Sequence, residues 1–222
     1  MAKLTGLFDS FDNLDQIDVN AISAWLKNPP QIFQLENYLA NKILYPQTIP
    51  LTEYDMKIDL AILREALRLN GPKSTAISAN ALLGDNPFLN ITLRKILIPE
   101  RFLRFVPDLV SLTWAFVDAL LYDRRKMDWF EDLWTIVLVN DIDEIIGSVI
   151  LPQFNSKDGE MEISVSDENY KIRPGSLTVV PCSKDRCEIS YKLSNGKILG
   201  KSESALEIFG GKLGLMIDGR II

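Results

Sequence analysis

The chain has 222 residues, a formal net charge of −6 and no histidine, and these properties exclude several classes of function. A net negative charge argues against a nucleic-acid role that depends on neutralising phosphates. The absence of histidine excludes histidine-activated nucleophiles, histidine acid–base catalysis and histidine-ligated metals. With 47% hydrophobic and 24% charged residues, the composition is that of a folded globular protein. We expect no membrane span, no metal and no cofactor, and the lack of a basic and apolar leader makes the cytoplasm the expected location.

The first 27 residues predict two short helices. Four aspartates between residues 9 and 18 alternate with apolar side chains at helical spacing, so we interpret them as the solvated face of a helix. A calcium loop would need acids two residues apart, a central glycine and a terminal glutamate, which this segment lacks. A second short helix is expected over residues 21–27.

The clearest predicted helix begins at Thr52. The Thr52 hydroxyl can cap the first turn and Asp55 completes a capping box, while the Asn70-Gly71-Pro72 sequence ends the helix. Further helices are expected over residues 87–98 and 107–124. The second of these is almost wholly apolar and therefore buried. Its carboxylate Asp118 is interpreted as a polar-edge or backbone-bonded group, with a ligand-facing acid as the alternative.

The later part of the chain predicts strands. Residues 134–139 are apolar and β-branched, which indicates a buried strand, and a turn or short helix should follow at residues 141–145. Asn195-Gly196 separates two strand-like runs and is typical of a two-residue type I′ hairpin. Further strands are expected at residues 161–165, 176–180, 205–209 and 213–217.

These elements predict an α/β protein of the α+β kind with two parts. Residues 1–150 should form a mainly helical part with a buried strand. Residues 151–222 should form a β-rich module, and a small all-β barrel or sandwich would close it.

Three small groups of residues invite a chemical role but have a plainer interpretation. Cys182 and Cys187 are the only cysteines, and we expect two inert thiols instead of a disulfide or a zinc site. Gly210-Gly211 lies between two expected strands, which favours a tight glycine hairpin over a phosphate loop. Asp218 and Arg220 flank a glycine, and we expect a structural ion pair or a strand-end contact there instead of a catalytic role.

Several motifs together resemble a known family. Leu39-Ala40-Asn41-Lys42, Pro46-x-Thr48-Ile49-Pro50 and Arg64-Glu65-Ala66-Leu67-Arg68 look like the MutL-type accessory proteins encoded beside adenosylcobalamin-dependent glutamate (methylaspartate) mutase, which are unrelated to mismatch-repair MutL. The tail from Gly210 to Arg220 is similar to that family's Gly-Gly-x-Leu-Gly-Leu-x-Ile-Asp-Ala-Arg segment. The family-motif residues are Asn41, Lys42, Pro50, Arg64, Glu65, Arg68, Gly210, Gly211, Asp218 and Arg220.

The resemblance implies an ATPase-like fold of the actin, hexokinase and heat-shock class, and a chaperone or reactivating role for a mutase. In that fold an N-terminal half supplies Asp-Gly phosphate loops, which these 222 residues lack. Where the adenosine turn would fall, Ala79 and Asn80 replace glycines, and a Cβ atom obstructs a close backbone approach to a ligand. The resemblance therefore implies that Ser78, Ala79, Asn80 and Gly84 line a nucleotide only with a partner chain.

We therefore expect the non-catalytic C-terminal portion of a MutL-type accessory protein that acts through protein contacts. Its partner would be an N-terminal ATPase half or a mutase subunit, and a homo-oligomer is also open. No catalytic residue is assigned, and ATPase activity is expected only if a partner chain completes the site. The alternative is a small-molecule or glycan-binding β module with a helical dimerisation platform. A hydrolase built on a carboxylate pair, such as Asp118 with Asp123, is the weakest interpretation.

Overall fold

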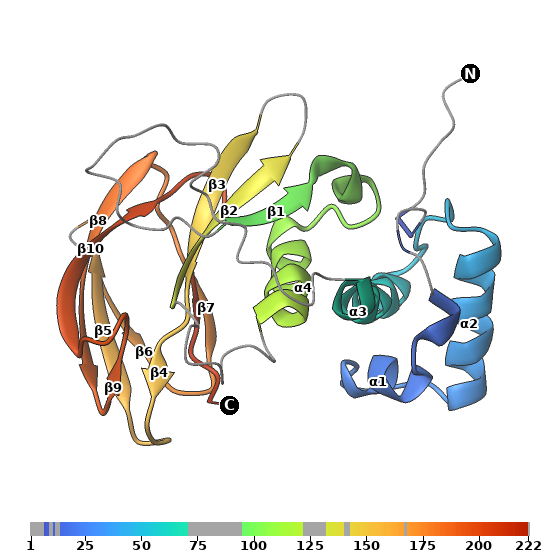
Figure 1. The fold of residues 1–222 in the computed structure, drawn as a ribbon, viewed down its shortest axis with the longest axis horizontal. Helices are drawn as coiled ribbons and strands as arrows, with labels where there is room; N and C mark the ends of the chain where they lie inside the picture. The colour runs from blue at the N-terminus through green and yellow to red at the C-terminus, as the bar shows by residue number, and fades with distance from the viewer. Residues whose placement is uncertain are drawn as a thin grey trace. The chain divides into compact units, whose positions relative to one another are not determined.

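The computed structural model describes residues 7, 8, 11, 14–70, 95–121, 132–139, 143–166 and 168–221 (Figure 1). It has the predicted α+β architecture. The chain forms two compact units, Met1–Ser74 with Glu100–Arg124, and Thr75–Pro99 with Arg125–Ile222. These limits differ from the expected division at residue 150, because three strands that precede residue 151 pair within the second unit.

The first unit is helical. Its described elements are the 3₁₀ helix η1 (Leu14–Gln16), α1 (Val19–Ala24), α2 (Ile32–Leu44), α3 (Glu53–Asn70), the 3₁₀ helix η3 (Glu100–Arg104) and α4 (Leu109–Leu121). The N-terminus of α3 has the predicted capping box. The Asp55 amide donates to the Thr52 hydroxyl at 3.0 Å, and the Thr52 amide donates to the Asp55 carboxylate at 3.0 Å. The sequence pattern does not predict α2.

The core of the first unit lies between α3 and α4, which pack against each other. Ile62 and Ala66 of α3 are fully buried, as are Leu112 and Ala115 of α4. An aromatic contact between Phe102 of η3 and Phe116 of α4, with ring centroids 5.9 Å apart, closes one side of this core. The predicted burial of the second long helix is therefore confirmed for the described residues.

The second unit contains two larger β-sheets and a two-stranded ribbon. Its strands are β1 (Lys95–Pro99), β2 (Leu133–Val139), β3 (Glu144–Ile150), β4 (Gln153–Phe154), β5 (Glu160–Val165), β6 (Glu168–Ile172), β7 (Leu177–Val180), β8 (Arg186–Ser194), β9 (Gly196–Lys197), β10 (Glu203–Phe209) and β11 (Gly214–Asp218). The five-stranded sheet has the order β1-β2-β3-β11-β7, and the four-stranded sheet has the order β10-β8-β5-β6. The β1–β2 and β3–β11 pairs are parallel, whereas the other pairs are antiparallel.

The two larger sheets share one hydrophobic core. Along β8, buried and exposed side chains alternate strictly, and Ile189 and Tyr191 point inward. The five-stranded sheet contributes Ile150, Leu215 and Ile217 to the same cluster. The sequence predicts that a small barrel or a sandwich closes the β module. Among the described strands neither sheet closes into a barrel, so the observed arrangement is the sandwich.

Two predictions of local structure are wrong. The helix expected over residues 87–98 is replaced at its end by β1, in which Ile96 and Ile98 are buried and alternate with exposed Lys95 and Leu97. Residues 87–94 lie outside the described part. The turn or helix expected at residues 141–145 is replaced at residues 144–145 by the start of β3, which pairs with β2.

The predicted hairpin at Asn195-Gly196 is also wrong. Asn195 adopts a left-handed φ of 61°, but Gly196 has no positive φ, and a type I′ turn requires both. The segment after Asn195 instead forms β9, which pairs with β4, whereas the antiparallel neighbours of β8 are β10 and β5. Gly196 allows this pairing, because a Cβ atom there would lie 2.7 Å from the Gln153 carbonyl oxygen.

A search of the described helices for one long and apolar enough to cross a membrane found none.

Candidate functional site

Lys42 belongs to a buried polar cluster between α2 and α3. Its ammonium group donates to Asp59 Oδ2 at 2.8 Å, and the Tyr38 hydroxyl donates to Asp59 Oδ1 at 2.9 Å. Burial raises the pKa of Asp59 although Lys42 and Tyr38 stabilise its charge, and burial next to Asp59 raises the pKa of Tyr38. Lys42, Asp59 and Tyr38 each have hydrogen-bond partners within the fold, which is the pattern of a structural ion pair.

The same lysine fixes the segment that connects α2 to α3. The Lys42 ammonium donates to the Thr48 carbonyl at 3.0 Å, and the Thr48 hydroxyl donates to the Tyr45 carbonyl at 2.9 Å. The Tyr45 amide donates to the Asn41 carbonyl at 2.8 Å, which ties the segment to the end of α2. Pro46 and Pro50 restrict the backbone further.

Residues 43–51, which are the last two residues of α2 and the chain that follows it, are here called the apolar connector because they expose large apolar side chains to solvent. The exposed fractions are 69% for Leu44, 55% for Tyr45, 60% for Ile49 and 92% for Leu51. Hydrophobic residues scattered singly on a surface are ordinary, but four within eight positions on a restrained backbone form a feature that is typical of an interaction site.

The segment from Arg64 to Arg68 also forms structural contacts. Arg64 Nε donates to Asp118 Oδ2 at 2.7 Å and so joins α3 to α4. Glu65 accepts from Trp25 Nε1 at 2.6 Å and from Arg68 at 3.1 Å, and the Arg64 guanidinium lies 5.2 Å from the centre of the Trp25 ring. Asp118 is thus an ion-pair partner within the helical unit, whereas the sequence favoured a polar-edge or backbone-bonded group.

Gly210 and Gly211 hold a disulfide loop instead of a phosphate. Cys182 and Cys187 are bonded to each other, so the expectation of two free thiols is wrong. A Cβ atom on Gly210 would lie 2.2 Å from the Lys184 carbonyl oxygen, and the Gly211 amide donates to the Cys182 carbonyl at 2.8 Å. The loop of residues 182–187 therefore packs on these glycines.

The glycine pair is also not the turn of a hairpin. It connects β10 to β11, which belong to different sheets, so the chain crosses from one sheet of the sandwich to the other at this point. Gly211 has a φ of +125°, which favours glycine. Glycine is needed at position 210 because the disulfide loop approaches it closely, and at position 211 because of its positive φ.

The remaining motif residues have the following positions. Arg220 contacts both carboxylate oxygens of buried Asp218, at 2.9 and 2.7 Å, which confirms the predicted ion pair. Pro50 lies in the apolar connector and Asn41 in the last turn of α2. The proposed nucleotide-lining residues Ser78, Ala79, Asn80 and Gly84 lie outside the described residues.

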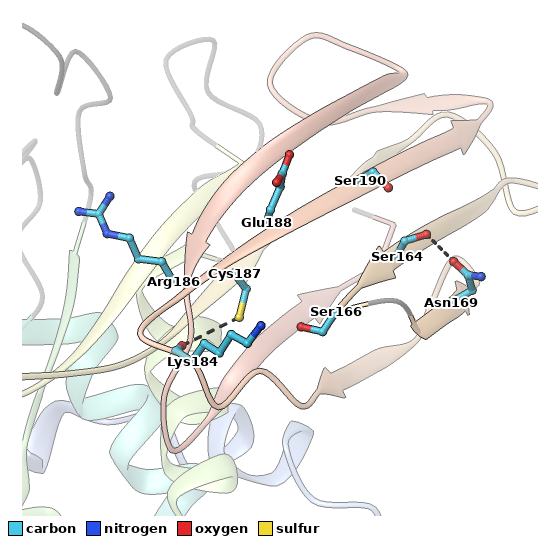
Figure 2. A pocket seen from close by; sticks show the side chains of 8 residues that line it. All are labelled: Ser164, Ser166, Asn169, Lys184, Arg186, Cys187, Glu188 and Ser190. Carbon is cyan, nitrogen blue, oxygen red and sulfur yellow. Dashed lines mark hydrogen bonds between the residues drawn. The ribbon is translucent and has the colours of Figure 1, made fainter.

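The second unit has a polar concavity on the outer face of the four-stranded sheet, with a volume of about 550 Å³ (Figure 2). Its lining residues come from β5, the turn after β5, β6, β8 and the disulfide loop, namely Ser164, Ser166, Asn169, Lys184, Arg186, Cys187, Glu188 and Ser190. Sequence reasoning missed this surface. The alternation of exposed serines and charges along β5 and β8 is the signal that marks one solvated face, but strand pairing was needed to bring them together.

A buried carboxylate was missed as well. Asp132 is 3% exposed and accepts hydrogen bonds from the Gln153 side chain at 2.8 Å and the Leu199 amide at 2.7 Å. These contacts fasten the segments around β4 and β9, so this carboxylate stabilises the fold. In the part of the chain that the structure describes, no group of three or more metal-ligating side chains occurs.

Comparison of the chain with family models, with curated proteins and with solved structures found no match.

Proposed function

We propose that the protein is a non-catalytic accessory protein that binds a protein partner through the apolar connector. The observation that carries the proposal is the exposure of Leu44, Ile49 and Leu51 on a backbone held by Lys42 and Thr48. A restrained segment loses little conformational entropy on binding, so its apolar surface contributes more of its burial energy to affinity.

The motif residues support a structural role over a catalytic one. Lys42, Arg64, Glu65 and Asp218 form ion pairs or hydrogen bonds within the fold. We propose, on the resemblance to MutL-type accessory proteins, that the partner is a cobalamin-dependent mutase subunit or the nucleotide-binding half of an ATPase. One of the motifs that carry this resemblance, Pro46-x-Thr48-Ile49-Pro50, lies within the apolar connector.

The test measures binding of the full chain to purified glutamate mutase subunits by biolayer interferometry. The double variant Ile49→Ser/Leu51→Ser should bind at least about tenfold more weakly, since burying two aliphatic side chains contributes about 1.5–3 kcal/mol each. Leu177→Ser on β7 is the matched control, because Leu177 is 45% exposed in the other unit. Binding that survives the connector substitutions would contradict the proposed surface, and absence of binding by the wild-type chain would contradict the mutase as partner.

The proposal also states that the chain alone does not bind ATP. A calorimetric titration with ATP and magnesium should give no binding heat beyond dilution. Tight binding by the chain alone would contradict a non-catalytic role and would favour an autonomous ATPase lobe.

A cytoplasmic location stays a prediction. Disulfides are typical of oxidising compartments, so the Cys182–Cys187 bond argues against it. Alkylation of protein taken directly from its cells, followed by mass spectrometry, measures whether the two thiols are paired there. Paired thiols would contradict a reducing cytoplasmic location.

A further inference from the structure

The polar concavity lies between two rows of long charged side chains. Its floor is a row of short polar residues brought together by strand register, in which Ser164 of β5 is opposite both Ser190 of β8 and Asn169 of β6. Ser164 also hydrogen bonds to the Asn169 side chain. Short side chains between long ones leave room on the sheet surface, which explains the hollow.

In the charged row on one side of the floor, each of the two lysines is paired with one or two glutamates. Lys171 contacts Glu160 and Glu162 at 3.1 and 3.0 Å, and Lys192 contacts Glu203 at 3.6 Å. The hydrogen bond to Glu162 and that to Glu160 raise the pKa of Lys171, so it stays protonated beside its partners. This row therefore forms a wall in which neither Lys171 nor Lys192 is an unpaired cation for an anionic ligand.

The other side of the concavity carries three charged side chains, those of Arg186, Lys184 and Glu188, and they differ in whether they form an ion pair. Arg186 is paired with Glu207 at 3.1 Å and lies over the Phe209 ring, and in Figure 2 it points away from the serines. In contrast, within the described residues no ion pair involves Lys184 or Glu188. Figure 2 shows the Lys184 ammonium end directed toward Ser166, with Glu188 farther along β8.

The backbone that carries Lys184 is held in place by the fold. It lies in the loop closed by the Cys182–Cys187 disulfide, and the Gly210 amide donates to the Asp185 carbonyl at 3.2 Å. Because the loop backbone is restrained, ligand binding needs to order only the Lys184 side chain and not the loop that carries it.

We propose that this concavity binds a saccharide that carries a carboxylate, such as a hexuronic acid. Its volume lies in the range of small-molecule sites, but its polar lining offers little apolar surface, so the ligand must itself be polar on most sides. Hydroxyl, amide and carboxylate side chains pair with sugar hydroxyls as donors and acceptors. Lys184 supplies a charge-assisted hydrogen bond to the sugar carboxylate, and Glu188 accepts from ring hydroxyls.

The test titrates the isotope-labelled full chain with D-glucuronic acid and, separately, with D-glucose, and follows backbone amide shifts by NMR. Glucuronic acid should shift the amides of residues 164–169 and 184–190 and bind about tenfold more tightly than glucose, because one charge-assisted hydrogen bond is lost with the neutral sugar. Lys184→Gln should abolish this preference, whereas Glu188→Gln should weaken both sugars. Lys201→Gln, an exposed lysine outside the lining, is the matched control and should leave both affinities unchanged.

Absence of shifts in these two segments at saturating sugar would overturn the proposal. Equal affinity for the two sugars, or a preference that persists in Lys184→Gln, would overturn the assignment of a carboxylated ligand. The variant Ile49→Ser/Leu51→Ser should bind the sugar normally, so failure of the connector proposal and failure of this one are distinguishable.

Discussion

The Lys42 ammonium lies 2.8 Å from Asp59 Oδ2, and both side chains are almost fully buried. This contact joins α2 to α3. The same ammonium binds the Thr48 carbonyl, so one side chain stabilises the helical core and fixes the surface segment that we propose as a docking site.

Lys42→Met should destabilise the protein strongly. The substitution keeps most of the apolar stem but leaves Asp59 buried without its cation, and breaking such a pair costs about 3–5 kcal/mol. Urea denaturation of the variant and the wild type gives the difference in free energy of unfolding. Lys57→Met is the control, because the Lys57–Glu53 pair is solvent-exposed and should hardly affect stability. Equal effects of the two substitutions would contradict the structural role of Lys42.

Stability should depend on pH through Asp59. Burial raises its pKa above the ordinary value of 3.8, so the folded protein holds this proton more tightly than the unfolded chain. The stabilisation is therefore complete below pH 3.8 and is lost as pH rises through the folded-state pKa. Over that window the wild type should lose free energy of unfolding relative to Asp59→Asn, as measured by urea denaturation at several pH values.

Glu53 provides a control of opposite sign. The hydrogen bond from Lys57 lowers the pKa of Glu53. The Glu53 carboxylate therefore stabilises the folded protein at pH values above its ordinary pKa, and this stabilisation is lost as the pH falls through the folded-state pKa. Relative to Glu53→Gln, the wild type should therefore gain stability as pH rises. The same sign for both residues would show that the Asp59 effect does not come from its burial.

The disulfide should contribute modestly to stability. Cys182 and Cys187 are five positions apart, and closing so short a loop is expected to stabilise the fold by about 2 kcal/mol. The double variant Cys182→Ser/Cys187→Ser should lose about that amount in urea denaturation. Reduction of the wild type should have a similar effect, and no effect of reduction would contradict the bond.

Gly210→Ala should be far more damaging than Gly175→Ala. A Cβ atom at Gly210 would meet the Lys184 carbonyl oxygen at 2.2 Å and the Cys182 carbonyl oxygen at 2.3 Å, so the backbone must shift. We expect a cost of about 3 kcal/mol or more. Gly175 has a φ of +86° but open space around it, so alanine there should cost only about 1–2 kcal/mol of backbone strain. Thermal unfolding of the two variants compares these costs, and equal costs would contradict the close packing of the disulfide loop.

The sequence predicted those helices and strands that are determined by interactions between residues close together in the chain. The Thr52–Asp55 box places the start of α3 correctly because both partners lie within one turn. The sequence pattern did not predict α2, because its first residues, Ile32 and Phe33, are apolar yet exposed, which obscures the helical period. Its N-terminus depends on a glutamine capping box, a weak sequence signal.

The remaining wrong predictions concern residues whose structure depends on strand pairing, which the sequence does not show directly. β1 was mistaken for a helix because a short apolar run has no clear period, and its parallel pairing with β2 settles its state. The Asn195-Gly196 dipeptide favours a hairpin, but pairing of β9 with β4 competes with it. The polar concavity could not be predicted, since the register between β5 and β8 is set by the sandwich core and not by either strand alone.

Hydrogen–deuterium exchange of the full chain with and without glutamate mutase subunits tests the central claim most directly. The proposed binding surface predicts slower exchange in residues 43–51 when the mutase is present, with little change in the strands around Leu177. Unchanged exchange in residues 43–51, or protection confined to the β unit, would contradict docking through the apolar connector.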